Sequence, residues 1–282
     1  MPLNQNAVRS PFRKLNKQLS KLAKKTLPEN IHKFRTSSRR VEVLVEELAE
    51  NRTRNDKKLV KLLARLRKKA GRVRDLDVEI AVLRSLKVPE EPVRKSQLMR
   101  ALAEERAARE KKLVKALDQK AFADLRKRLK RTAGSLRFSK DANPLAIAMQ
   151  KIAELDFDPG SITNATLHCF RIAGKRARYV AEMAGKGTEA AAFVEQLNRM
   201  QDALGDWHDW AQLAERARKR FGGVEDSSLV AVLRNVTRAK YRHAVNILTE
   251  TRTLVTTKKP VAVATMSRRP AREGSAGDAA VA

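Results

Sequence analysis

IHKFRTSSRR, residues 31–40, and LHCFRIAGKR, residues 167–176, carry one pattern of side chains in the two halves of the chain. In each stretch a histidine is followed by phenylalanine, arginine and then two adjacent basic residues at identical offsets. Neither stretch contains an acidic residue. Like charges repel one another, so a segment that gathers them without acids predicts a bound anion.

A helical wheel separates this pattern into two faces. In the first copy Phe34 lies with Val41, Val45 and Leu48 on an apolar side, which predicts a core stripe. The second copy places Phe170 with Ala177, Ala181 and Ala184 in the same way, and puts Tyr179 within its basic face. The opposite, basic faces comprise His32, Arg35, Arg39 and Arg40 in the first copy, and His168, Arg171, Lys175 and Arg178 in the second.

A solvated charged face is the common alternative for such a stripe. Solvated helices usually place a glutamate four residues from each basic residue, and these two stretches do not. Arginine offers forked donors that match phosphate oxygens, and a histidine gains charge more easily as a phosphate approaches. The repeated histidine and the absence of acids therefore favour an anion site over a solvated surface.

A second signature follows each basic helix. GRVRD at 71–75 and GDWHD at 205–209 both fit Gly-x-x-(Arg/His)-Asp, at nearly equal distances from their histidines. Two motifs in the same order indicate a tandem duplication of a helical bundle. The aspartates, Asp75 and Asp209, either orient Arg74 and His208 or cap a helix after a glycine turn.

Composition predicts an all-α protein. Ala, Leu, Lys, Arg and Glu dominate the 282 residues, and no run of alternating Val, Ile and Thr suggests a sheet. Turn signals, including Pro28, Gly71 and Gly222-Gly223, place helices near 9–26, 30–50, 55–70, 74–86, a broken 90–136, 142–155, 161–184, 188–204, 206–221 and 227–254. We expect a flexible 1–8, bundles over 9–137 and 138–255 related by a pseudo-twofold around a basic cavity, and a disordered basic tail over 256–282.

The net charge of +29 implies an anionic partner, either nucleic acid or another polyanion. A further stripe, Lys61, Arg65, Lys68 and Arg72, extends the basic surface of the first half. Its counterpart in the second half is less basic, with Glu195, Arg199, Asp202 and Asp206 at the matching positions. The first half is therefore expected to carry the larger positive field.

The paired motifs resemble the CHAD domain, the conserved histidine α-helical domain, over roughly residues 9–255. The resemblance implies two helical bundles around a basic cavity that binds inorganic polyphosphate. It implies the ligands His32, Arg35, Arg39, Arg40, Arg74, His168, Arg171, Lys175, Arg176, Arg178 and His208, to which the stripe adds Lys68 and Arg72. The first motif departs from the family at Glu42, where a basic residue is common; this acid either weakens one edge of the site or tethers a neighbouring arginine.

Other chemistry finds little support in the sequence. There is no metal-binding histidine spacing, no nucleophile motif and no phosphate-binding glycine loop. Cys169, the single cysteine, excludes an internal disulfide and is expected at a packing position, as is at least one of Trp207 and Trp210. No apolar run is long enough to span a membrane.

The expected function is non-catalytic polyphosphate binding in the cytoplasm, associated with polyphosphate granules, with no metal or other cofactor. The alternative is a nucleic-acid-binding protein that uses the same basic surface, although no helix-turn-helix or stacking aromatics support it. An enzyme acting on phosphoanhydrides is a third reading, and it needs acids to hold Mg²⁺ beside the phosphates. Oligomeric state and preferred chain length stay open.

Overall fold

The computed structural model describes residues 5–88, 90–138, 142–155, 162–185 and 187–257, and this part of the chain is all-α, as predicted. Apart from an isolated bridge between Ala49 and Phe138, its regular structure is helical. The helices are α1 (Gln5–Lys24), α2 (Pro28–Val43), α3 (Arg54–Ser85), α4 (Pro92–Ala116), α5 (Gln119–Ser135), α6 (Pro144–Ala153), α7 (Asn164–Ala181), α8 (Thr188–Phe221) and α9 (Ser228–Thr257). A π-helical turn, Leu44–Leu48, extends α2, and a 3-10 turn, Glu182–Ala184, extends α7.

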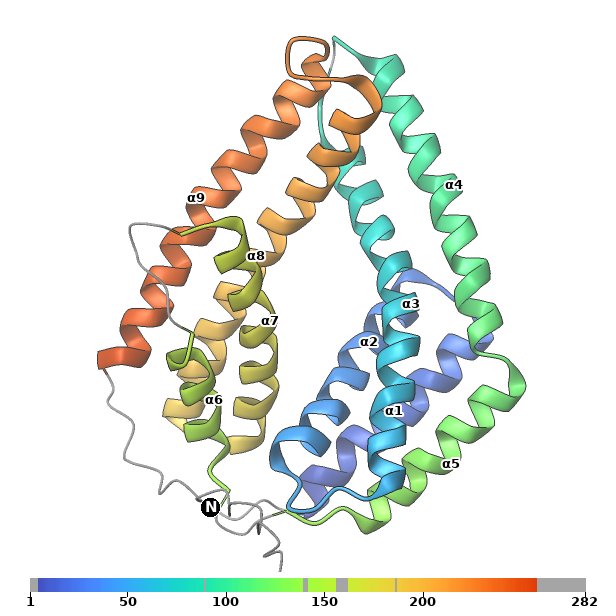
Figure 1. The fold of residues 1–282 in the computed structure, drawn as a ribbon, viewed down its shortest axis with the longest axis vertical. Helices are drawn as coiled ribbons and strands as arrows, with labels where there is room; N and C mark the ends of the chain where they lie inside the picture. Colours follow the sequence, from blue (N-terminus) through green and yellow to red (C-terminus); the bar gives the residue numbers. More distant parts are fainter. Residues whose placement is uncertain (1–4, 89, 139–141, 156–161, 186, 258–282) are drawn as a thin grey trace, which may run out of the picture.

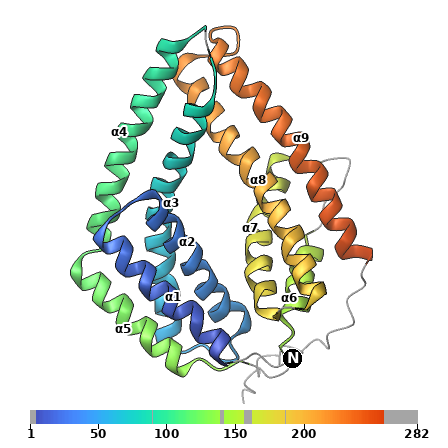
Figure 2. The same cartoon turned by 180° about the vertical axis from the view of Figure 1, so that it is seen from behind.

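The chain forms two groups of helices that lean against each other (Figure 1). The first group contains α1 to α5 and the second contains α6 to α9, and the long pairs α3–α4 and α8–α9 converge at one end (Figure 2). Between the groups α2 packs against α7 and α3 packs against α8. The two helices that carry the histidine motif therefore meet at the centre of the molecule. Whether a pseudo-twofold axis relates the groups stays a prediction.

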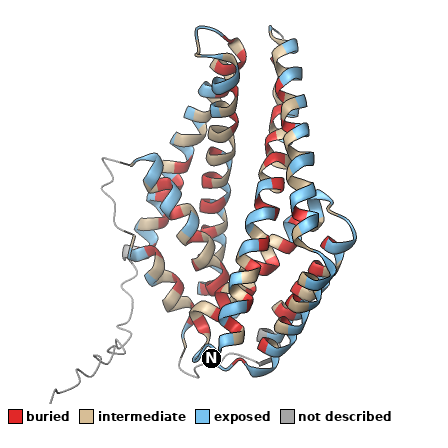
Figure 3. Cartoon of the chain, turned by 45° about the vertical axis from the view of Figure 1, so that its right-hand side comes forward, coloured by how far each residue is buried: buried red, intermediate tan, exposed pale blue. Residues whose placement is uncertain are grey.

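Each helix buries one stripe of apolar residues, which Figure 3 shows as red bands along the sides that face neighbouring helices. Phe34 and Phe170, the phenylalanines of the repeated motif, are both at most 1% exposed, as the wheel predicts. They belong to a main core that draws on both groups. A smaller core at the converging end combines Leu76 and Leu83 of α3 with Leu213 of α8 and Leu233 of α9. Burial of these stripes fixes which faces remain for the site.

Several predicted boundaries hold, and three are wrong. The predicted break within 90–136 is confirmed, because α4 ends at Ala116 and Asp118 caps α5 by accepting from the Ala121 N–H at 2.7 Å. The first helix begins at Gln5 rather than at residue 9, and the predicted tail lies outside the described residues beyond 257. The breaks predicted at Gly71 and Gly205 do not occur, because α3 and α8 run through both glycines.

Gly71 is in the middle of a helix because another helix passes close to it. A Cβ atom at this position would lie 2.1 Å from Nη1 of Arg35, which reaches over from α2. Glycine leaves room for the guanidinium, and that close approach outweighs the cost of about 1 kcal/mol that glycine carries inside a helix. Gly205 has nothing within 4 Å of the same hypothetical atom. Gly71 of the repeated signature therefore allows a side chain of another helix to approach closely, whereas Gly205 does not have this role.

We predict a gain in stability from alanine at Gly205 and no such gain at Gly71. Gly205→Ala should raise the free energy of unfolding by about 0.5–1 kcal/mol, because alanine favours the helix and meets no neighbour. Gly71→Ala should not show this gain, because its methyl group displaces Arg35. Urea unfolding of both variants measures the difference, and equal gains would contradict the role given to Gly71.

Candidate functional site

A cavity of about 570 Å³ lies where α2, α3, α7 and α8 meet. Eight of the predicted site residues line it. Five come from the first group of helices, namely His32, Arg35, Arg39 and Arg40 of α2 and Arg74 of α3, and three come from α7 of the second group, namely Arg171, Lys175 and Arg178. Seven of these eight are basic at neutral pH. The structure thus brings the basic faces of both motif helices to one cavity.

Four of these basic residues have no direct partner. Arg39, Arg74, Arg171 and Lys175 form no hydrogen bond or ion pair within the described part of the chain, and Nε of Arg171 is buried without a hydrogen-bond acceptor. Burial and the neighbouring arginines lower the pKa of Arg39 to about 10 and that of Lys175 to about 7. A lowered pKa means that the charged form is unfavourable there, so the cavity is an environment that an anion would stabilise.

Arg35 is held in place by the first half. Its Nη1 donates to the carbonyl oxygen of Arg67 at 3.5 Å, and its Nη2 lies 3.8 Å from Oδ1 of Asp75. Asp75 belongs to the middle of α3, and its carboxylate lies beside the guanidinium of Arg35 on α2. Both readings made from the sequence, a helix cap after a glycine turn and an orienting contact with Arg74, are replaced by this pairing across two helices.

Four aspartates also line the cavity: Asp75, Asp202, Asp206 and Asp209. Asp206 is occupied by Lys240, whose Nζ lies 2.9 Å away. Burial raises the pKa of Asp209 to about 6 even though Arg171 acts in the other direction. Three of these acids belong to α8, so the α8 side is the less positive wall, in line with the expectation of a lopsided field.

Arg40 and Arg178 reach the cavity but share an acid. Arg40 makes a bidentate contact with Glu182, with Nε at 2.8 Å and Nη2 at 3.2 Å from its oxygens. Arg178 lies 3.7 Å from the same carboxylate and donates to Asn198 at 2.7 Å. Both guanidinium groups lie over the ring of Tyr179, at 5.4 and 4.7 Å from its centroid. These two arginines are consequently less available to an anion than Arg39.

Five predicted residues do not line the cavity: Lys68, Arg72, His168, Arg176 and His208. Arg176 instead contacts Glu46 and Glu47 at 2.7 Å and links the two halves. The exposed side chains of Lys68 and Arg72 lie on another face of α3. His168 and His208 lie beside each other, with ring centroids 6.1 Å apart. These five residues lie outside the cavity lining, and their contact with an anion stays a prediction.

His32 inside the cavity and His208 beside it are poor cations. Burial and the nearby Arg74 and Arg35 lower the pKa of His32, and burial together with Arg171 lowers that of His208 to about 4. One ring nitrogen of His208 is 2.6 Å from Nε2 of Gln212. Both rings are neutral near pH 7 when the cavity is empty, so the positive charge comes from arginine and lysine.

Sequence reasoning missed Thr36 and Gln201, which also line the cavity. Gln201 is buried and donates to the carbonyl oxygen of Gly174 at 3.1 Å, which ties α8 to α7. In the repeated pattern Gln201 of α8 corresponds to Arg67 of α3. This correspondence is the signal in the sequence that could have identified Gln201. Glu42 tethers Arg67, with 2.8 Å between Oε1 and Nη2, so the departure from the family pattern at this residue holds a neighbouring arginine.

Other predictions about single residues divide. Trp207 is only 5% exposed, as core packing predicts, whereas Cys169 is exposed and the packing position expected for it is wrong. Among the described residues no group of three His, Cys, Asp or Glu side chains is arranged to hold a metal ion. No helix in that part of the chain is both long and apolar enough to cross a membrane.

The fold and the cavity define a class: an all-α protein with a partly buried cavity at its centre that is lined mainly by basic side chains. The model of the CHAD domain matches residues 6–218, and the chain belongs to this family. CHAD domains in general are linked to polyphosphate binding and are non-catalytic.

Solved structures agree on the fold. The CHAD domain from the plant Ricinus communis superposes with a TM-score of 0.64 at 18% identity and covers 90% of each chain. PptA from Streptomyces chartreusis superposes with a TM-score of 0.62 at 14% identity and covers 92% of this chain and all of its own. A comparison with curated proteins gives no match.

The lowered pKa of Lys175 predicts how stability depends on pH. Because its folded-state pKa of about 7 lies below the unfolded value near 10.4, the unfolded chain holds more protons between these values. This residue's penalty is therefore complete below about pH 7 and is relieved as pH rises toward 10. Lys175→Met should raise the melting temperature at pH 7 by about 2–4 °C, which corresponds to about 1 kcal/mol, and by less at pH 9. Thermal melts at both pH values test this, and an equal rise at both would exclude charge burial as its cause.

Proposed function

We propose that the protein binds inorganic polyphosphate in the central cavity and does not act on it as an enzyme. The observation that carries the proposal is the meeting of Arg39, Arg171 and Lys175, three cations from two motif helices without a hydrogen bond or ion pair in the described residues. A chain of phosphate groups supplies closely spaced oxygen acceptors on a thin backbone. Each contact from a guanidinium or ammonium group is charge-assisted and is therefore stronger than a neutral hydrogen bond.

The shape of the site favours a thin polyanion over duplex nucleic acid. A duplex presents its phosphates on the outside of a wide cylinder, whose major groove alone is about 12 Å across. The contacts with Arg39 and Lys175 lie within a cavity of about 570 Å³ rather than on a flat surface. Duplex DNA would reach mainly the outer charges, whose attraction falls steeply with salt.

The acids in the cavity do not form a metal-holding set. Asp75 lies beside Arg35 and Asp206 is held by Lys240. Phosphoryl transfer usually places Mg²⁺ between carboxylates and phosphate oxygens. A binding role therefore accounts for this arrangement better than hydrolysis does. The location that we propose for this role is the cytoplasm, with the protein attached to polyphosphate granules.

A matched pair of double variants tests the cavity. Arg39→Gln with Lys175→Gln should weaken the binding of long-chain polyphosphate at least thirty-fold, because two charge-assisted contacts of about 1–2 kcal/mol each are lost. Lys68→Gln with Arg72→Gln replaces the same two residue types on the exposed face of α3 and should cost less than about three-fold. Fluorescence titrations at about 0.15 M salt measure both.

Two outcomes would count against this site. Similar losses in both double variants would mean that only the overall charge attracts the ligand. Duplex DNA that binds as tightly as polyphosphate, compared per phosphate, and that loses affinity in the cavity variant would favour the nucleic-acid alternative.

Binding should also weaken as pH rises from about 6 to 8. Over this range Lys175, with a pKa of about 7, loses its charge in the empty cavity, and Asp209, with a pKa of about 6, becomes negative. A bound phosphate favours the protonated lysine, so binding takes up protons. Calorimetry in buffers of different ionisation enthalpy detects this uptake. Lys175→Arg stays charged and should flatten the pH profile; an unchanged profile would assign the effect elsewhere.

A further inference from the structure

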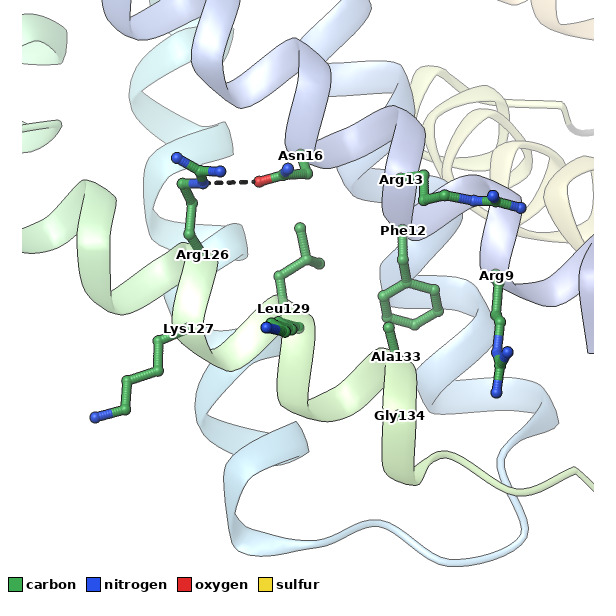
Figure 4. Close-up of a pocket in the computed structure, with 10 residues that line it drawn as sticks. Arg9, Phe12, Arg13, Asn16, Arg126, Lys127, Leu129, Ala133 and Gly134 are labelled. Atoms are coloured by element: carbon green, nitrogen blue, oxygen red, sulfur yellow. Dashed lines mark hydrogen bonds between the residues drawn. The ribbon is translucent and has the colours of Figure 1, made fainter.

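Basic residues alone do not mark a binding site on a chain with a net charge of +29. A hollow of about 590 Å³ between α1 and α5 illustrates this (Figure 4): five arginines and lysines line it, and Arg126 donates to the neutral Asn16 at 3.0 Å. Its apolar residues Phe12 and Leu129 are already packed in the main core, and none of the described residues that line it is acidic. The central cavity differs, because an acid outside its lining contacts two of its arginines.

That acid is Glu182, in the 3-10 turn that extends α7. Arg40 and Arg178 line the cavity, whereas Glu182 does not. Its carboxylate accepts from Nε and Nη2 of Arg40 at 2.8 and 3.2 Å, and it lies 3.7 Å from Nε of Arg178. The hydrogen bond with Glu182 raises the pKa of Arg40, so the carboxylate stabilises the charge of this arginine. A single negative charge thus serves two basic residues of the cavity wall.

This shared contact compensates Arg178 only in part. Nε of Arg178 is buried without a hydrogen bond, because 3.7 Å is too long for one. Its Nη1 donates to the amide oxygen of Asn198, which carries no charge. Both guanidinium groups also lie over the ring of Tyr179, which holds them at the cavity wall by a contact that does not involve Glu182. Phosphate oxygens accept charge-assisted hydrogen bonds from the same donors that now meet the carboxylate.

The helix that precedes Glu182 does not account for an acid at this position. Glu182 directly follows Ala181, the last residue of α7. The C-terminal end of a helix carries partial negative charge from its free carbonyl groups, which makes a carboxylate there unfavourable. Glu182 therefore gains its stabilisation from the arginines of the cavity wall rather than from its own helix.

We propose that Glu182 is an internal competitor for the anion: its carboxylate holds Arg40 and Arg178 when the cavity is empty, and a bound polyphosphate chain takes its place at both arginines. The inference rests on the function proposed for the cavity and adds the residue that limits its affinity. Because Arg40 belongs to the first group of helices and Glu182 to the second, binding exchanges a contact between the halves for contacts with the ligand.

Glu182→Gln tests the competition, because it removes the charge and keeps the size of the side chain. The variant should bind long-chain polyphosphate at least about five-fold more tightly than the wild type, since charge-assisted donors of two arginines become available. Fluorescence titrations at about 0.15 M salt measure the change.

Glu215→Gln is the matched control. Glu215 also contacts two basic residues, Arg218 and Lys219, and neither of them lines the cavity. The substitution removes the same negative charge from the chain, and it should change the affinity less than about two-fold, because the contacts of Glu215 are exposed and screened.

A double-mutant cycle and thermal melts add independent readouts. In a chain that carries Arg40→Gln, the gain from Glu182→Gln should fall to about two-fold, because only Arg178 remains to be released. Without ligand, Glu182→Gln should melt at a lower temperature than the wild type, because two arginines lose their acid. Saturating polyphosphate should then raise its melting temperature by more than it raises that of the wild type. If this variant melts too low for titration, Glu182→Asp, which shortens the side chain, should give a smaller gain in the same direction.

Four outcomes would overturn the competitor role. Equal affinity of the wild type and Glu182→Gln would do so and would leave the cavity as the binding site. A loss of affinity would mean that Glu182 positions the arginines for the ligand. A gain of similar size in Glu215→Gln would assign the effect to net charge. If neither the wild type nor Glu182→Gln binds polyphosphate, the function proposed for the cavity fails, and this inference fails with it.

Discussion

Repulsion among the cations of α2 and α7 is the constraint on which the centre of this molecule depends. The two basic faces are brought together because the opposite faces of the same helices, with Phe34 and Phe170, are buried in the core. Apolar burial of this kind contributes several kcal/mol per pair of large side chains. It outweighs the unfavourable charge of Arg39 and Lys175, whose lowered pKa values reflect that conflict. The empty cavity is thus a locally unfavourable part of a stable structure.

Ion pairs around the cavity involve only one residue of each adjacent basic pair. Arg40 pairs with Glu182 across the two halves, and Arg176 pairs with Glu46 and Glu47 in the same region. Each member of an adjacent basic pair therefore has a different role: Arg39 and Lys175 face the cavity without a partner, while Arg40 and Arg176 attach one half to the other. The same motif that predicts an anion site also supplies the ion pairs that join the two halves beside the cavity.

The sequence predicted the helices and their buried faces well, because helical periodicity is a local property of the chain. It could not place Gly71, since the reason for glycine is the guanidinium of Arg35 on another helix. Nor could the sequence show that Arg40 forms an ion pair and Arg39 does not, because the acid that pairs with Arg40 lies in the other half. The helical wheel could have placed Arg72 outside the cavity, because at 100° per residue it lies about 200° around the helix from Arg74, which does line it.

The stability of the folded protein and the binding of an anion in the cavity are linked thermodynamically. An anion that binds only the folded state adds its binding free energy to folding stability. The charges of Arg39, Arg171 and Lys175 are costly when the cavity is empty and become favourable when phosphate oxygens approach them. Replacing them with apolar residues would make the empty protein more stable and remove the attraction for the anion. A conflict between stability and binding at the same side chains would therefore distinguish the proposed site from an ordinary charged surface.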